Sequence, residues 1–475
     1  MTSMASMTSM TSMTTARVRA VFVETWGCQM NELDGRRLVG LLLHEGYREA
    51  LSAEEADLVL LNTCSVRDKA EQKVYDRLGR LALMKRERPG MVIGVCGCVA
   101  QQEGEHLLKR APYVDFVLGT GRIEALPTVL RRVDEEGDRP VEIGFDLDEV
   151  AYSPGSIAHA LPYRAAITVI EGCNKSCTFC VVPLTRGRER SRRLSDIVAE
   201  AKHLVEDGVV EVELLGQTVN AYRDPDSGKG LSDLLVEIGR LPGLRRLRFV
   251  TSHPRNFDDL LIQAMAETRT ACRTLHLPVQ SGSDRVLGRM KRQYTREDYV
   301  GLVNRLRRAM PELALSTDVI VGFPGEGENE FAETLSLLQE IQFSNVFSFT
   351  YSPRPHTAAA RWERDVPSRL ASERLARLMD LQQDIQRAIN NGIVGSRLEV
   401  LVDGLDRKGG RLSGRSACNR VVNFDGTGAR VGDFVDVLVE KGLPNSLSGR
   451  LLGSPLDKSA AESLDCQRGD GCREV

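Results

Sequence analysis

The sequence predicts an α/β protein of three parts: an N-terminal domain with a parallel sheet, a central partial (βα)6 barrel, and a small C-terminal β-barrel. Three observations lead to this prediction. Strand-like and helix-like segments alternate from Arg17 onward, which is the pattern of a parallel sheet covered by helices. Further strands in the middle of the chain end in loops rich in glycine and polar residues. After Gly395 the chain changes to short β segments.

The composition is that of an ordinary globular protein. The chain has 475 residues, 42% of them hydrophobic and 27% charged, which is enough for about three domains. No apolar run reaches about eighteen residues, so we expect no membrane span. The net charge of −3 argues against nonspecific coating of nucleic acid but allows a local basic face. Eleven cysteines without a secretion signal indicate a reducing, cytoplasmic setting and thiolate chemistry.

Changes in composition suggest where the domains begin and end. The Met/Ser/Thr repeat at the start reads as a leader or a start-site artefact rather than a secretion signal. The acidic stretch 135–149 suits a connection, and 368–391 reads as a long amphipathic connecting helix. The predicted boundaries are a disordered leader at 1–16, an N-terminal domain at 17–135, a central domain at 155–390, a barrel domain at 393–455 and a disordered tail at 456–475.

Three cysteines of the first domain follow predicted strands. The strands are expected at 18–25, 56–63, 91–98 and 113–119, with helices at 31–43 and about 68–86. Cys28, Cys64 and Cys98 are separated by 36 and 34 residues, close to one βα unit each. The loops of successive units lie side by side at one sheet edge, so the three thiols should converge beside helix N-termini.

These three cysteines have two interpretations. They could be unrelated, partly buried side chains, but their repeated position at strand ends favours a cluster with three protein ligands. Cys96 lies inside the third strand and should be a core side chain, with a minor alternative role as a ligand.

The stretch from Glu171 to Cys180 carries the strongest signal in the chain. Cys173, Cys177 and Cys180 stand at positions i, i+4 and i+7. Three thiolates on one short turn can hold three irons of a 4Fe–4S cluster and leave the fourth iron open. Soft thiolates also select zinc, but zinc would need a fourth ligand, and the closest candidate, His159, lies outside the loop.

This spacing resembles the signature of the radical S-adenosylmethionine enzymes. The resemblance implies that S-adenosylmethionine chelates the open iron through its amino and carboxylate groups. One electron from the cluster would then cleave the cofactor to methionine and a 5′-deoxyadenosyl radical. The six strands of the partial barrel are expected at 163–171, 210–215, 246–250, 274–277, 315–321 and 345–350.

Two strand-end loops are candidates for contacts to S-adenosylmethionine. They contain Gly216 and Gln217, and Asp318, Gly322 and Glu326. The alternative, that they are only turn residues, carries equal weight.

Two basic features of the sequence bear on RNA binding. Five arginines lie between Arg186 and Arg193, which suits a phosphate-facing patch or a solvated helix start. The segment 393–455 holds nine Lys/Arg and seven Asp/Glu, so its basic excess is slight. Its length suits a five-stranded nucleic-acid-binding barrel, although few aromatic residues are available for base stacking.

Taken together, the motifs resemble the radical S-adenosylmethionine methylthiotransferases, and within them the tRNA-2-methylthio-N6-dimethylallyladenosine synthases. The resemblance rests on 27–31 (GCQMN), on 171–192 and on 276–283 (HLPVQSGS). It implies a second 4Fe–4S cluster on Cys28, Cys64 and Cys98, and an RNA-binding TRAM domain at the C-terminus. His356 and Ala358 depart from the family, which usually has Gly and Pro there, and Leu184 stands where Tyr is common.

The reaction that this resemblance implies is insertion of sulfur and a methyl group at C2 of N6-isopentenyladenosine, at position 37 of tRNA. That C–H bond is unactivated, so no side-chain acid or base could break it, and no catalytic residue is expected beyond the cluster ligands. The expected partners are tRNA, an electron donor such as flavodoxin or ferredoxin, and a sulfur donor.

Other functions remain open at this point. The nearest are methylthiotransferases for threonylcarbamoyl-adenosine in tRNA or for an aspartate of a ribosomal protein. A non-catalytic iron–sulfur RNA-binding protein and a zinc-binding RNA protein are alternatives of another class.

Overall fold

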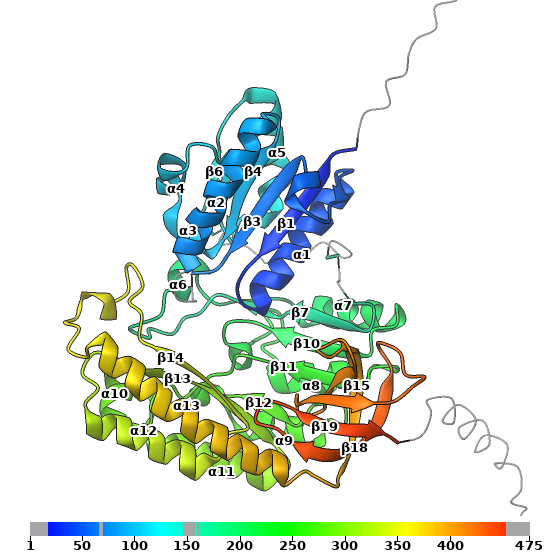
Figure 1. Ribbon diagram of the computed structural model, residues 1–475, viewed down its shortest axis with the longest axis vertical. Helices are drawn as coiled ribbons and strands as arrows, with labels where there is room; N and C mark the ends of the chain where they lie inside the picture. Colours follow the sequence, from blue (N-terminus) through cyan, green and yellow to red (C-terminus); the bar gives the residue numbers. More distant parts are fainter. Residues whose placement is uncertain (1–17, 66–69, 146–156, 159–160, 453–475) are drawn as a thin grey trace, which may run out of the picture. The chain divides into compact units, whose positions relative to one another are not determined.

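The computed structural model describes residues 18–65, 70–145, 157–158 and 161–452. They form two compact units (Figure 1): the first ends at Phe145 and also contains Ile157 and Ala158, and the second begins at residue 161. The predicted leader at 1–16 and tail at 456–475 lie outside the described residues, as does the end of the predicted connection. Among the described helices, none is both long enough and apolar enough to cross a lipid bilayer.

The first unit is built on a six-stranded parallel sheet with the order β2-β1-β3-β4-β5-β6. Its strands are β1 (Ala20–Thr25), β2 (Arg48–Glu49), β3 (Leu58–Thr63), β4 (Val92–Gly97), β5 (Phe116–Leu118) and β6 (Val141–Glu142). Its helices are α1 (Gln29–His44), α2 (Ala70–Glu87), α3 (Cys98–Glu103), α4 (Glu105–Arg110) and α5 (Leu126–Glu136). The parallel sheet was predicted, whereas the two-residue edge strands β2 and β6 were not.

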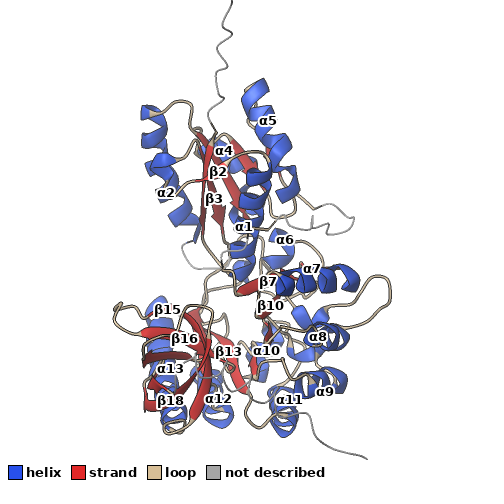
Figure 2. Cartoon of the chain, turned by 90° about the vertical axis from the view of Figure 1, so that its right-hand side faces the viewer, coloured by secondary structure: helices blue, strands red, loops and turns tan. Residues whose placement is uncertain are grey.

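Helices cover both faces of this sheet, and α2 and α5 lie on opposite sides of it (Figure 2). Side chains alternate along each strand, so each strand contributes to two separate cores. In β4, Ile93 and Val95 face one core, and Cys96 faces the other. Cys96 is therefore a core side chain, as its position inside the strand predicted, and burial raises the pKa of its thiol.

The second unit contains the predicted partial barrel of six parallel strands. Two three-stranded sheets form it, β7-β10-β11 and β12-β13-β14. A single bridge between Leu247 and Ala271 leads from β11 towards β12. The strands are β7 (Arg164–Thr168), β10 (Glu211–Leu215), β11 (Arg246–Phe249), β12 (Thr274–His276), β13 (Ala314–Val321) and β14 (Asn345–Thr350); a small hairpin of β8 (Ile170–Glu171) and β9 (Arg190–Ser191) follows β7.

Helices α7 to α12 alternate with these strands and share one core with them. The helices of this part are α6 (Val182–Thr185), α7 (Leu194–Glu206), α8 (Leu231–Gly239), α9 (Asp259–Glu267), α10 (Asp284–Arg289), α11 (Arg296–Ala309) and α12 (Glu328–Ile341). The long helix α13 (Ser368–Asn391) was predicted with these bounds; it packs along β14 and reaches β18 of the last domain.

The C-terminal part is a closed barrel with the strand order β15-β16-β17-β19-β18. The strands are β15 (Arg397–Leu405), β16 (Leu412–Ser416), β17 (Val421–Asp425), β18 (Phe434–Gly442) and β19 (Leu447–Leu451). Closure leaves no free sheet edge, and inward-facing valines with Phe424 fill the interior.

Two buried arginines of β11 attach this barrel to the partial barrel. Arg246 donates to the carbonyl oxygens of Arg415 (2.8 Å) and Glu399 (2.9 Å). Arg248 donates to those of Ser416 (2.9 Å) and Ala417 (3.0 Å). The buried carboxylate of Glu211 lies 3.2 Å from Arg248 Nε and offsets the two charges. We call Glu211, Arg246 and Arg248 the arginine clasp; it fixes the turn between β16 and β17.

Candidate iron–sulfur and cofactor sites

The first predicted set of cysteines lies at the carboxyl ends of β1, β3 and β4. Cys28 caps the N-terminus of α1, Cys64 follows β3, and Cys98 is the first residue of α3. The thiols of Cys28 and Cys98 both face Asn31, with Sγ 4.0 and 3.7 Å from its Oδ1. A Cβ placed on Gly27 would lie 2.7 Å from Cys64 Cβ, so the first two loops are in contact. The structure thus brings the three loops together, as their spacing predicted.

Asn31 joins these loops through both its side chain and its main chain. Its Nδ2 donates to the carbonyl oxygens of Trp26 (3.1 Å) and Thr63 (2.9 Å), and its own carbonyl accepts from Asn62 Nδ2 (2.7 Å). Gly97 precedes Cys98 with φ of 90°, and a Cβ there would lie 2.6 Å from Thr63 O. A glycine is therefore required where β4 turns into the cysteine loop.

The second set lies on one loop after the β8 strand. Gly172 has φ of 77°, and a Cβ on it would lie 2.0 Å from Arg188 O, so only glycine fits before the first cysteine. Cys173 Sγ lies 3.5 Å from the hydroxyl of Thr218, and the Cys180 amide donates to Cys177 O at 3.1 Å. All three thiols are half-buried rather than packed in a core.

Residues from distant segments hold this loop. The Thr178 amide and hydroxyl donate to Met290 O (3.2 Å) and Arg289 O (2.9 Å). Phe179 packs edge-on against Phe323, with ring centroids 6.2 Å apart. The guanidinium of the buried Arg292 lies with Nη1 3.4 Å from Cys177 Sγ, so a fixed positive charge stands beside the loop.

Arg292 is itself held in place from three sides. Its Nη2 donates to Pro278 O at 2.9 Å, and its Nε donates to the Tyr294 hydroxyl at 3.0 Å. His253 lies nearby with its edge against the Tyr294 ring, and burial lowers its pKa to about 2, so its imidazole is neutral. A neutral, hydrogen-bonded His253 is a structural residue.

The first candidate loop for S-adenosylmethionine lies directly against the cysteine loop. The side-chain oxygen of Gln217 accepts a hydrogen bond from the Gly172 amide. A Cβ on Gly216 would lie 2.7 Å from Ile170 O, so the β10 loop and the β8 strand touch through their backbones. Gly216 and Gln217 thus support the turn that carries Cys173.

The second candidate loop surrounds the end of β13. Asp318 lies 3.3 Å from His276 Nε2 inside the partial barrel. The buried carboxylate of Glu326 accepts from the Gly322 amide (2.8 Å) and pairs with Arg374 of α13 (2.9 Å), which fixes the loop. Burial raises the pKa of Glu326, while these two partners favour its charged form. Contact with the cofactor stays a prediction for all five loop residues.

Three family models match the chain. The one described as "Uncharacterized protein family UPF0004" matches residues 20–119, "Radical SAM superfamily" matches 167–338, and "TRAM domain" matches 393–452. A curated protein of Geotalea uraniireducens, "tRNA-2-methylthio-N(6)-dimethylallyladenosine synthase", is 45% identical over 92% of this chain and 99% of its own length. The chain belongs to this synthase family.

A second member of the synthase family, from Methylococcus capsulatus, is 48% identical over 91% of this chain and 95% of its own length. The predicted family, the α/β fold class, the radical S-adenosylmethionine enzyme class and the TRAM barrel are confirmed. Among solved structures, the radical S-adenosylmethionine methyltransferase TsrM from Kitasatospora setae matches with a TM-score of 0.53. It is 17% identical and covers 72% of this chain and 75% of that one, a likeness that concerns the fold alone.

The two cysteine sets of this chain fit iron–sulfur clusters by their donor chemistry. Each set supplies three soft thiols. In the described residues, no three His, Cys, Asp or Glu side chains surround one point as a single ion would need. Cluster ligands bind separate irons, so they need not meet at one point. Burial raises the pKa of the Cys173 and Cys180 thiols, and a bound cation such as iron would favour their thiolate forms.

The arginine run at 186–193 is mostly structural rather than a free phosphate-facing patch. Arg190 pairs with Glu171 (3.2 Å), and Arg192 is buried and pairs with Glu200 (2.7 Å). Arg193 lies 3.6 Å from Asp226. The expectation of a phosphate-facing patch is therefore wrong for Arg190 and Arg192, because carboxylates from other elements pair with them; for the exposed Arg193 it stays a prediction.

Sequence reasoning missed Asn31 and Arg292 as site residues. Asn31 lies in the quoted motif at 27–31, three residues after Cys28, so its position was an available signal. Arg292 is 115 residues after Cys177, and no local pattern connects them.

Proposed function

We propose that this chain converts N6-isopentenyladenosine at position 37 of tRNA into its 2-methylthio derivative. The observation that carries the proposal is the two sets of three cysteines, one on three neighbouring loops of the parallel sheet and one on the loop after β8, in a chain whose synthase relatives match it almost from end to end. The TRAM barrel supports an RNA substrate.

Cys173, Cys177 and Cys180 would hold one 4Fe–4S cluster, and Cys28, Cys64 and Cys98 the other. When bound, the two clusters and S-adenosylmethionine supply the methylthio group and the radical that opens the C2–H bond. The chain's own residues bind and orient these groups. Arg292 places positive charge beside Cys177, and Thr218 contacts Cys173.

The loop residues Gly216, Gln217, Gly322 and Glu326 would frame the side on which S-adenosylmethionine binds. Asp318, expected in the same loop, lies within β13 and would face the cofactor from the strand. Glu326 acts by fixing the Gly322 turn, and Gln217 acts by holding Gly172. Because the hydrogen at C2 leaves as an atom rather than as a proton, the site needs no general base. It needs instead to exclude water from the radical.

The reaction also needs groups that the chain does not provide. We propose a one-electron donor such as flavodoxin or ferredoxin, and a sulfur donor that restores the N-terminal site after each turnover. We place the reaction in the cytoplasm, where tRNA and these reductants are available.

The decisive test is mass spectrometry of nucleosides from tRNA of cells with and without the gene. We expect 2-methylthio-N6-isopentenyladenosine to disappear and N6-isopentenyladenosine to accumulate when the gene is deleted. An unchanged profile, in cells shown to lack a second such enzyme, would reject this substrate. The threonylcarbamoyl-adenosine and ribosomal-protein alternatives would then be examined in the same extracts.

A further inference from the structure

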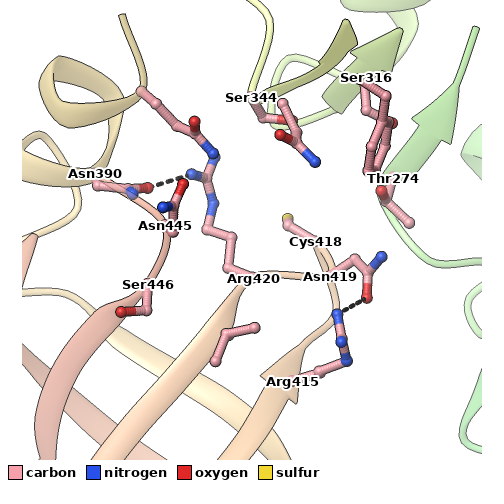
Figure 3. A pocket seen from close by; sticks show the side chains of 14 residues that line it. Thr274, Ser316, Ser344, Asn390, Arg415, Cys418, Asn419, Arg420, Asn445 and Ser446 are labelled. Carbon is pink, nitrogen blue, oxygen red and sulfur yellow. Dashed lines mark hydrogen bonds between the residues drawn. The ribbon is translucent and has the colours of Figure 1, made fainter. Parts of the chain in front are cut away.

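A polar cavity lies between the partial barrel and the TRAM barrel, away from the cysteine loop. It has a volume of about 320 Å³ and is shown in Figure 3. One wall comes from the first residues of β12 and β14, including Asn345 and Phe347, and from the end of α13. The other wall is the β16–β17 turn, with Arg415, Asn419 and Arg420. Its volume is at the lower end of the range for small-ligand pockets.

The chemistry of the lining is that of a nucleotide site. The fourteen described residues around the cavity include two arginines, five side-chain amides, four hydroxyls and one aromatic ring, and none is acidic. Amides can pair with the edge of a base, an aromatic ring can stack on its face, and arginine can bind phosphate. Phe347 lines the cavity with a half-exposed ring, which also makes a T-shaped contact with His276.

Arg420 gives the cavity an unbalanced positive charge. Four other arginines of the barrel pair with carboxylates: Arg397 with Asp436, Arg411 with Asp425, Arg415 with Asp403 and Arg450 with Glu440. Arg420 has no carboxylate within ion-pair distance among the described residues; its Nη1 donates to the neutral Asn390 Oδ1 at 2.7 Å (Figure 3). Burial lowers the pKa of Arg420.

The turn that carries Arg420 is rigid. The arginine clasp binds the carbonyl oxygens of Arg415, Ser416 and Ala417. The Ser416 hydroxyl accepts from the Arg420 amide at 3.2 Å. Asn390, the partner of Arg420, is itself buried and donates to Leu443 O at 2.6 Å. The cavity is therefore formed before any ligand arrives, which lowers the cost of binding.

Most of the cavity lies at the end of the strands opposite the candidate cofactor loops. Asn345 is the first residue of β14, whereas Gly216, Gln217, Gly322 and Glu326 follow the carboxyl ends of the strands. The six residues of β14 span about 17 Å. A phosphate on Arg420 therefore lies far from these loops, while Phe347 stands opposite Asp318 in the sheet.

We propose that this cavity binds one unpaired nucleotide of the tRNA, a few nucleotides from the modified adenosine, with its phosphate on Arg420 and its base on Phe347. This inference rests on the proposed function, because it takes tRNA as the ligand. An unpaired loop nucleotide is the suitable occupant, since it can be turned out of its stack at low cost.

The test measures binding of full-length, isopentenylated tRNA, labelled at its 3′ end, to the full-length chain by fluorescence anisotropy at several salt concentrations. Arg420→Gln should raise Kd about tenfold and reduce the slope of log K against log salt by roughly one. Phe347→Ala should raise Kd by about tenfold with no change in that slope. Arg420→Lys, which keeps the charge, should keep the slope.

The matched control is Arg450→Gln, which removes an exposed, paired arginine of the same barrel that does not line the cavity. Its Kd should stay within about twofold of wild type. Thermal melting of each variant checks that the barrel remains folded. If Arg420→Gln unfolds the barrel, Arg420→Lys and Phe347→Ala still decide the question.

Abasic substitutions in the anticodon loop locate the nucleotide. One abasic position should weaken binding to wild type about tenfold and should have no effect on binding to Phe347→Ala, because the two changes remove the same contact. The proposal would be overturned if the abasic substitution and Phe347→Ala had additive effects on Kd at every position. It would also be overturned if only Arg420→Gln weakened binding, because that result would indicate a phosphate contact without a base contact.

The outcomes also separate this inference from the proposed function. Wild-type protein that binds no tRNA would reject the proposed function. Wild-type protein that binds tRNA normally, with Arg420→Gln and Phe347→Ala matching Arg450→Gln, would reject the nucleotide pocket alone.

Discussion

The central site gathers its three cysteines from eight consecutive residues, whereas the N-terminal site takes them from loops 36 and 34 residues apart. The central loop is short, and it is held from outside by contacts from several segments, among them Arg292, Thr218 and Phe323. In the N-terminal site the loops meet around Asn31, which bonds to two of them. A cysteine motif on one short loop is thus held by contacts from other segments. Cysteines on separate loops are instead held together by one residue, Asn31, which we call the hub.

The largest expected effect separates the two sites by their chemistry. Cys173→Ala should lower the yield of 5′-deoxyadenosine after reduction by at least about 100-fold, because it removes a ligand of the cluster that cleaves the cofactor. The measurement is chromatography of the reaction mixture. Cys272→Ala, a buried cysteine outside both sets, is the control. Equal yields from wild type and Cys173→Ala would falsify the radical assignment.

The same assay should give the opposite pattern for the N-terminal site. Cys64→Ala should leave the yield of 5′-deoxyadenosine within about threefold of wild type but lower the methylthiolated tRNA product at least about 100-fold. Cys96→Ala, which removes a core thiol of the neighbouring strand, should retain the product. Loss of product in Cys96→Ala, with the fold intact, would instead make Cys96 a ligand.

Substitution of Asn31 tests directly whether the N-terminal site depends on one residue more than the central site does. Asn31→Ala leaves the buried carbonyl oxygen of Thr63 and the partly buried one of Trp26 without this donor, and should destabilise the first unit by about 1–3 kcal/mol. It should also lower the iron content per chain towards half, with 5′-deoxyadenosine formation retained. Asn174→Ala, at an exposed asparagine of the central loop, should cost less than about 1 kcal/mol. Calorimetry would measure the loss of stability, and iron analysis the loss of iron. Equal losses of stability and iron in Asn31→Ala and Asn174→Ala would argue against Asn31 as a hub.

Substitution of Arg292 should change the reduction potential of the central cluster without preventing the cluster from binding. Arg292→Gln takes away the positive charge beside Cys177, so adding an electron to the cluster becomes harder. We expect its reduction potential to fall by about 59 mV, a tenfold change for a one-electron couple. Redox titration followed by electron paramagnetic resonance measures this. Arg296→Gln, at an arginine paired with Glu340, is the control, and an unchanged potential in Arg292→Gln would remove its electrostatic role.

The smallest effect concerns strain in the loops around the central site. His356 has φ of 65°, which costs a side chain about 1 kcal/mol and costs glycine little. His356→Gly should raise the free energy of unfolding of the second unit by less than about 1 kcal/mol, because the freer unfolded chain offsets part of the gain. The first unit should melt unchanged. His356→Ala keeps the strain, so an equal gain from alanine would exclude this explanation.

The sequence was most informative where the signal is local or periodic. The spacing of Cys173, Cys177 and Cys180, the strand ends at Cys28, Cys64 and Cys98, and the helix α13 could all be read from neighbouring residues. The family's Gly at the position of His356 agrees with the left-handed backbone found there.

The rest depended on partners that are distant in sequence. Arg190 and Arg192 resembled a phosphate patch because their carboxylates, Glu171 and Glu200, come from other segments. Arg292 and the arginine clasp reach their targets only after folding. The edge strands β2 and β6 have two residues each, too few to show an alternating pattern.

The arginine clasp has a consequence for how the last domain could change over time. Arg246 and Arg248 donate hydrogen bonds to main-chain carbonyl oxygens of the TRAM barrel. Every residue presents the same carbonyl group, so this part of the attachment depends on the path of the β16–β17 turn. The side chains of Glu399 and Phe434 also contact Arg245 and Arg246, so they belong to the attachment as well. Substitutions on the barrel surface away from these contacts can therefore change what the barrel binds without disturbing its attachment to the partial barrel.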